Sequence, residues 1–132
     1  EKKEIETTFE LIDIIKSSMP QKAMRDSHPA RRTFQALRIE VNGELDQLNT
    51  ALDDMFDCLK VGGILSIITF HSLEDRIVKE QFAKWCQGCT CPKEFPVCVC
   101  GKTPRGKVTI KGLAPSEEEL SNNSRSHSAR LR

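Results

Sequence analysis

The segment 62–76, GGILSIITFHSLEDR, ends a short apolar run in a cluster of His, Ser, Glu, Asp and Arg side chains. In an open α/β sheet, ligands bind beyond the carboxyl ends of the strands, so a cluster at this place can form a site. The alternative is structural, because a loop and a helix cap must follow any strand. Ser72 would then cap the next helix, with Glu74 and Asp75 in its first turn, where the helix dipole favours acids.

His71 is the sharper candidate in this cluster, since neither a core nor a cap requires a histidine at that position. An imidazole can exchange a proton near neutral pH, which makes His71 the tentative catalytic residue of the chain. Arg76 is expected to pair with either neighbouring acid.

Five of the six cysteines crowd between Cys86 and Cys100, in the sequence CQGCTCPKEFPVCVCG. Two C-x-C pairs separated by six residues can supply four thiolates to a tetrahedral zinc ion. The symmetrical set is Cys89, Cys91, Cys98 and Cys100, in which Cys86 can replace one member. Reduced free thiols and disulfides are the alternatives.

Two helices are predicted ahead of these clusters. A capping signal at Thr7 or Thr8 with Glu10 begins a helix that runs to about Ser18. Apolar side chains then recur at spacings of three and four over 34–59, which predicts one long amphipathic helix.

The long helix carries three further expectations. Gly43 is expected to bend it, and Pro29 can sit in its first turn. Cys58, near its end, is expected to be a buried thiol.

The short apolar run 64–70 is predicted to be a strand covered on both faces, as in a parallel sheet. The remaining elements are a helix from 72 to 85, a cysteine-rich loop at 86–106, a strand at 107–113, a helical turn at 115–120 capped by Ser116, and a strand at 128–132. One central strand cannot make a sheet. The pattern therefore predicts the back half of an α/β domain whose front half the chain does not contain.

Size and composition restrict the class of protein. With 132 residues, 38% of them hydrophobic and 30% charged, the chain has the composition of one globular domain with a modest core. A net charge of +1 argues against a non-specific nucleic-acid coat, although the final eight residues are locally basic. Without a membrane-length apolar run or a secretory signal at the start, a cytoplasmic protein with no membrane partner is expected.

Three blocks of the sequence resemble the bacterial 16S rRNA (cytosine-N4) methyltransferase family, also called MraW-like. They are HPARRTFQALRIEVNGEL at 28–45, GGILSIITFHSLEDRIVK at 62–79 and LAPSEEELSNNSRSHSARLR at 113–132, in the family's order. Arg31 departs from the family pattern, as do Ser124 and His127, which stand where the family tail has Pro and Arg. The Cys-rich insert occurs only in some members.

The resemblance implies a Rossmann-like enzyme that uses S-adenosylmethionine to methylate N4 of a cytidine in 16S rRNA of the small ribosomal subunit. It also implies that the family's Gly-rich cofactor loop is absent, because Gly62 and Gly63 precede the strand instead of following one. The chain is thus expected to be a C-terminal fragment that binds no cofactor and is inactive without the N-terminal half of the same enzyme. Residues 1–27 would end the family's inserted helical region and form a linker, and 28–132 would be the C-terminal part of the catalytic domain. The oligomeric state is left open.

Contacts to the RNA are expected from side chains of all three blocks. Phe70 can stack on a base or close the strand's core, while the basic residues bind phosphate or form a solvated surface. The candidates are His28, Arg31, Arg32, Arg38, Phe70, Ser72, Glu74, Arg76, Arg125 and Arg130. Two other hypotheses stand beside this one: an independent, zinc-stapled RNA-binding module, and a marginally folded product of truncation.

Overall fold

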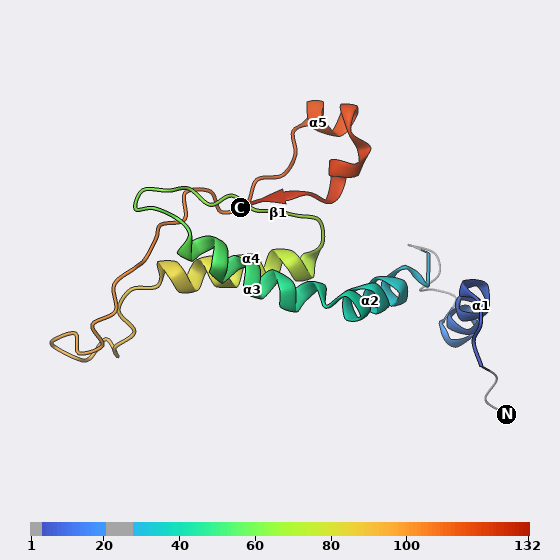
Figure 1. Cartoon of the computed structure of the whole chain (residues 1–132), viewed down its shortest axis with the longest axis horizontal. Coiled ribbons are helices and arrows are strands. Elements are labelled where there is room, and N and C mark those ends of the chain that lie inside the picture. Colours follow the sequence, from blue (N-terminus) through green and yellow to red (C-terminus); the bar gives the residue numbers. More distant parts are fainter. Residues whose placement is uncertain (1–3, 21–27) are drawn as a thin grey trace. The chain divides into compact units, whose positions relative to one another are not determined.

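The computed structural model of the chain describes residues 4–20 and 28–132 (Figure 1). The chain divides into two compact units, Glu1–Glu44 and Leu45–Arg132. Most of the linker expected between the first helix and residue 28 lies outside the described residues. The domain boundary expected after residue 27 stays a prediction.

The first unit contains helices α1 (Thr8–Ser18) and α2 (Arg31–Asn42). The capping signal of α1 is confirmed: Thr7 Oγ1 accepts the Glu10 N–H, and the Glu10 carboxylate accepts the Thr7 N–H. This reciprocal pair satisfies two backbone donors that have no partner inside the helix.

The predicted long helix is two helices, α2 and α3 (Glu44–Asp57), because the chain leaves helical geometry between them. Gly43 caps the end of α2 with a φ of 61°, a left-handed conformation that a side chain disfavours. At its start, Ala30 is the N-cap, so Pro29 precedes the helix and the expectation that it sits in the first turn was wrong.

In the second unit, α3 packs beside α4 (Ser72–Cys86), and the two helices form the core (Figure 1). Leu52 of α3 and Val78 of α4 are fully buried. The rings of Phe56 and Trp85 stack with centroids 4.1 Å apart. Large side chains buried between helices each contribute about 1.5–3 kcal/mol, so this contact dominates the stability of the unit.

The predicted strand is short: β1 (Ile68–Thr69) pairs with β2 (Arg130–Leu131). The pairing is antiparallel, so the strand's neighbour within the described residues is not the parallel one that its apolar run suggested. The final strand is confirmed. The strand expected at 107–113 is not formed, and only Leu113 bridges to Leu131 there, with reciprocal backbone hydrogen bonds of 2.8 and 2.9 Å.

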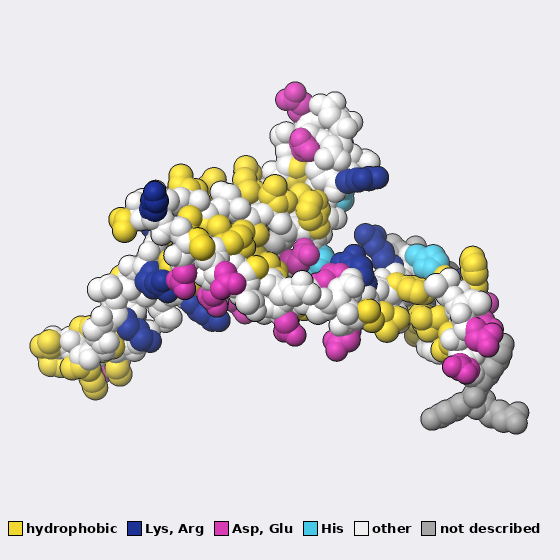
Figure 2. Space-filling model, viewed as in Figure 1, with side chains coloured by type: hydrophobic (Ala, Val, Ile, Leu, Met, Phe, Trp, Pro, Cys, Tyr) yellow, Lys and Arg dark blue, Asp and Glu magenta, His cyan; other side chains and the backbone are white. Residues whose placement is uncertain are grey.

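The two faces of the 64–70 segment differ sharply. Successive side chains of an extended chain point to opposite faces. Leu65 and Ile67 pack against the helical core and Thr69 is buried, whereas Ile64 and Ile68 on the other face are 84% and 59% exposed. The expectation of two covered faces is met on one face only within the described residues. Figure 2 shows hydrophobic side chains lying open over this part of the molecule.

The C-terminal segment forms α5 (Glu117–Asn122) and a 3-10 helix, η2 (Ser124–Ser128), before β2. The predicted cap of α5 is confirmed, since Ser116 Oγ accepts the Glu119 N–H at 3.1 Å. Among the helices of the described residues, none has both the length and the apolar character needed to span a bilayer.

Candidate functional site

The polar cluster after β1 is a helix cap, and His71 is its central residue. His71 is the N-cap of α4: its Nδ1 accepts the Glu74 N–H at 3.3 Å. In return, the Glu74 carboxylate accepts the backbone N–H groups of Phe70 and His71 at 2.9 and 3.2 Å. The expectation that Ser72 caps the helix was wrong, and so was the premise that a cap needs no histidine here, because an unprotonated ring nitrogen can replace the usual side-chain oxygen.

This arrangement determines the tautomer of the imidazole. Because Nδ1 of His71 accepts a hydrogen bond, the ring proton resides on Nε2. Nε2 lies 3.1 Å from Glu74 Oε1, but the two atoms are not aligned as a hydrogen bond, and Nε2 is buried with no hydrogen-bond partner among the described residues. Both ring nitrogens therefore face the cap rather than the solvent.

Three neighbours of His71 are solvent-exposed. Phe70 is 55% exposed, so it does not close the core of the strand as its position suggested. Ser72 and Arg76 are exposed on the first turn and a half of α4. Arg76 pairs with neither neighbouring acid. Glu74 accepts the cap hydrogen bonds, and Asp75 has another partner.

That partner is Arg132, at the other end of the unit's sequence. Its guanidinium donates from Nε and Nη2 to the two oxygens of Asp75, at 2.6 and 2.8 Å, and from Nη1 to the Lys111 carbonyl at 2.6 Å. The Arg132 hydrogen bonds hold the pKa of Asp75 below its usual value of 3.8, and Asp75 raises the pKa of Arg132. This bidentate pair fastens β2 to the start of α4.

The basic residues at the start of α2 are exposed. Arg31 and Arg32 are its first two residues, and the His28 carbonyl accepts the Arg31 N–H at 3.0 Å in the preceding turn. Their side chains point into solvent near a helix N-terminus, a position that favours anions. Arg38 differs, because it donates from Nε and Nη2 to the Glu44 carboxylate at 2.8 and 2.9 Å.

The tail candidates are also exposed but lie in different elements. Arg125 belongs to η2, where its N–H donates to Asn123 Oδ1. Arg130 lies in β2, opposite Thr69, and its side chain is exposed, as its alternation with Ala129 and Leu131 suggested.

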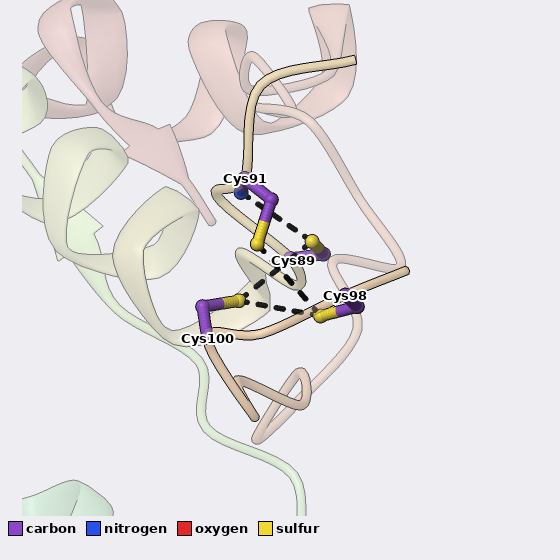
Figure 3. Close-up of side chains that lie close together, drawn as sticks. All are labelled: Cys89, Cys91, Cys98 and Cys100. Atoms are coloured by element: carbon purple, nitrogen blue, oxygen red, sulfur yellow. Dashed lines mark hydrogen bonds between the residues drawn. The ribbon is translucent and has the colours of Figure 1, made fainter. Parts of the chain in front are cut away.

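The cysteine loop brings four of the predicted thiols together (Figure 3). The sulfurs of Cys89, Cys91, Cys98 and Cys100 all lie within 4.8 Å of one another. Three of the separations are 4.0 Å (Cys91–Cys98), 3.5 Å (Cys98–Cys100) and 3.7 Å (Cys100–Cys89). Cys86 is not a member of this group, and Cys58 is exposed, so the expectation that it is buried was wrong.

The backbone amides around the cluster act on the thiol protons. The N–H groups of Lys102 and Thr90 donate to Cys100 and lower its pKa to about 5. The N–H of Val99 lowers the pKa of Cys91. For Cys89 the Cys91 N–H also acts to lower the pKa, but the sulfur–sulfur hydrogen bonds outweigh it and raise that pKa to about 11. The loop therefore favours negative charge on some sulfurs and protons on another.

The exit of the loop is attached to the core by Arg105. Its N–H donates to the Trp85 carbonyl at 2.7 Å, and its Nη2 donates to Asp57 at 2.9 Å. The guanidinium lies 4.6 Å from the centroid of the Phe56 ring, a cation–π contact. Neither this anchor nor the Asp75–Arg132 pair was predicted. Both join residues far apart in the sequence, and no local pattern identifies such partners.

Comparison with known proteins gives a consistent result. The model of the MraW methylase family matches residues 1–132. Ribosomal RNA small subunit methyltransferase H of Clostridium botulinum (strain Hall) is 58% identical over 129 residues, which are 97% of this chain and 42% of that protein. Ribosomal RNA small subunit methyltransferase H 2 of Agathobacter rectalis is 58% identical over an alignment that covers 100% of this chain and 43% of that protein.

The chain thus spans about two-fifths of the length of these curated relatives. The family resemblance seen in the three sequence blocks is confirmed over the whole chain. The chain belongs to the MraW methylase family.

Proposed function

We propose that the complete protein containing this chain is an S-adenosylmethionine-dependent methyltransferase that methylates N4 of a cytidine in small-subunit rRNA. The observation that carries the proposal is the 58% identity, over 97% of the chain, to a protein named ribosomal RNA small subunit methyltransferase H. A ribosomal substrate would place the protein in the cytoplasm. The independent zinc-stapled RNA-binding module is not favoured, because the similarity extends far beyond the cysteine loop.

The open face of the 64–70 segment supports the view that this chain supplies only part of a Rossmann-like catalytic domain. Ile64 and Ile68 expose apolar surface that a sheet in an α/β domain normally buries under helices. Burying it would gain about 25 cal/mol per Å² of apolar area. We propose that the remainder of the same protein covers this apolar face, since the alignment with the Clostridium botulinum relative covers only 42% of that protein.

The described residues of this chain do not form a binding site for S-adenosylmethionine. Neither strand among the described residues is followed by a Gly-rich turn, and the paired glycines precede β1. S-adenosylmethionine would supply the methyl group from a site in the remainder of the protein. The expected consequence is that the chain alone is inactive.

The contribution of this chain to the reaction is positioning. The N4 amino group of cytosine is a weak nucleophile because its lone pair is delocalised into the ring, so its orientation and surroundings decide the rate. The base must leave its stack to be reached, and an exposed aromatic ring can support it. Phe70, held by its N–H bond to Glu74, offers such a ring, and His71 acts as a positioning residue through the cap.

RNA binding is assigned first to the start of α2. Arg31 and Arg32 expose two positive charges that no described acid neutralises, whereas Arg38 is held by Glu44 and contributes less. Replacing both Arg31 and Arg32 with Ala in the complete protein should weaken rRNA binding and reduce the slope of log K against log salt by about 1.4–1.8. The matched control replaces two exposed lysines elsewhere in the chain, Lys16 and Lys79, with Ala and should leave the slope unchanged.

The activity is tested with the complete natural protein, unmethylated small ribosomal subunits and S-adenosylmethionine carrying a labelled methyl group. Digestion of the rRNA to nucleosides should yield labelled N4-methylcytidine. Label on another atom or another nucleoside would contradict the proposed specificity. Calorimetry with residues 1–132 alone should show no binding of S-adenosylmethionine, and tight binding would contradict the incomplete-domain account.

A further inference from the structure

The spacing of the four cysteine sulfurs matches one particular kind of metal site. Zinc holds thiolates at about 2.3 Å, so four of them at the corners of a tetrahedron stand about 3.8 Å apart. The separations of 3.5, 3.7 and 4.0 Å fall on both sides of this value. All six separations are within 4.8 Å, which suits a single ion. An iron–sulfur cluster would push its ligands further apart, because bridging sulfides lie between its irons.

The thiol alternatives explain the geometry less well. A disulfide bond joins two sulfurs at about 2.05 Å, and all six cysteines of the chain are free. Four uncharged thiols are weak hydrogen-bonding groups that give little reason for the chain to converge on one point. A shared cation gives that reason.

The rest of the loop cannot order itself by packing. No side chain from 87 to 104 is buried, and Phe95, Val97 and Val99 are 52–74% exposed. Ordering a loop of this length without secondary structure costs much conformational entropy. The interactions that oppose this cost are the sulfur cluster, a turn hydrogen bond from the Phe95 N–H to the Pro92 carbonyl, and the two ends of the loop. Small polar loops of this kind are commonly folded by a bound metal.

The backbone around the sulfurs also contributes to the site, through a hydrogen bond to a sulfur and a turn after the last cysteine. Gly101 has a φ of 63°, a left-handed conformation that turns the chain directly after Cys100. The Cys91 N–H donates to Cys89 Sγ at 3.4 Å. Such hydrogen bonds orient metal ligands and stabilise their charge.

We propose that Cys89, Cys91, Cys98 and Cys100 bind one zinc ion, which folds the 86–106 loop. Four protein ligands leave no open position for a substrate or water, so the role is structural rather than catalytic. Thiolates bind the ion, so each bound thiol gives up its proton. The proposal is independent of the methyl-transfer activity.

The first test is the zinc content of the complete natural protein, purified under reducing conditions without added chelator. One zinc per chain is expected by elemental analysis. Cys98→Ser removes a ligand and should weaken zinc binding more than about 100-fold, since losing only an outer-layer partner already costs 10- to 100-fold. Cys86→Ser and Cys58→Ser are matched controls outside the cluster and should keep one zinc.

A second measurement covers the case in which a Cys98→Ser variant fails to fold. Cobalt(II) replacing the metal in the unmutated protein should give the visible absorption of a tetrahedral four-thiolate site. Removing the metal with a strong chelator should open only the 86–106 loop to proteolysis. Reduced protein that contains no zinc, and takes up neither zinc nor cobalt, would overturn the proposal, as would loss of zinc on replacing Cys86 but not Cys98.

Discussion

The helical core and the cysteine loop of the second unit are stabilised in different ways. The core buries Leu52, Val78 and Trp85 between two helices. The loop buries no side chain from 87 to 104, and its polypeptide converges on four sulfurs. Apolar burial needs many side chains on regular elements, whereas a metal needs only four ligand atoms. We therefore expect the core to unfold without releasing the metal, and the loop to lose its metal without unfolding the core.

The largest effect is expected from removing the aromatic stack. Trp85→Ala should cost about 3–5 kcal/mol, because it leaves a cavity against Phe56 and Phe82. Urea unfolding of the complete protein measures the loss, and Val97→Ala in the exposed loop is the control, expected within about 0.5 kcal/mol. Zinc content should be unchanged in both variants. Release of zinc from Trp85→Ala would show that the two regions are coupled.

The next effect concerns the pair that fastens β2 to α4. Asp75→Asn should cost about 1.5–3 kcal/mol at neutral pH, the range for hydrogen bonds to charged groups. Because Arg132 lowers the pKa of Asp75 from 3.8, the extra stability of the unmutated protein is complete above about pH 4 and is lost as the pH falls through the lowered pKa. The gap between the two proteins in unfolding free energy should therefore close in acid. A gap that stays constant with pH would contradict the ion pair.

A smaller effect is expected at the cap. His71→Ala should cost about 1 kcal/mol, and His71→Asn should restore most of it, since Asn is a good N-cap residue. Thermal unfolding measures the stability, and methyl transfer to small subunits measures the function. If positioning is the role of His71, the Asn variant keeps its kcat. A stable Asn variant with a large loss of kcat would instead support proton transfer by His71.

The smallest effect is expected at the junction of the two regions. Arg105→Ala removes an exposed ion pair with Asp57 and an exposed cation–π contact with Phe56, together worth about 1 kcal/mol or less. Arg105→Lys, which keeps the charge, should recover part of the loss. Chemical denaturation measures both. Zinc retained in both variants would show that the sulfurs hold the loop without this anchor.

Local signals predicted the elements they border. The capping signals of Thr7 with Glu10 and of Ser116 and the final strand are found in the structure, whereas the bend expected at Gly43 is a break between two helices. The strand expected at 107–113 is not formed. It has the right residue types, but a strand needs a partner along its length, and only Leu113 has one.

The candidate site divides in the same way. Cysteine spacing favoured the four thiols that converge, with Cys86 as an alternative member, because short C-x-C steps restrict where a chain can place its sulfurs. His71 was selected for the wrong structural reason, since its neighbour Ser72 is the more usual capping residue.

The sequence by itself determined the family, the caps of α1 and α5 and the set of converging cysteines, because each is written in neighbouring residues. The tertiary structure alone decided that Asp75 pairs with Arg132, that Arg105 covers Phe56 and that one face of the 64–70 segment stays open. These features join positions 48 or more residues apart, or depend on what covers a surface. Folding brings such partners together, and no local pattern encodes them.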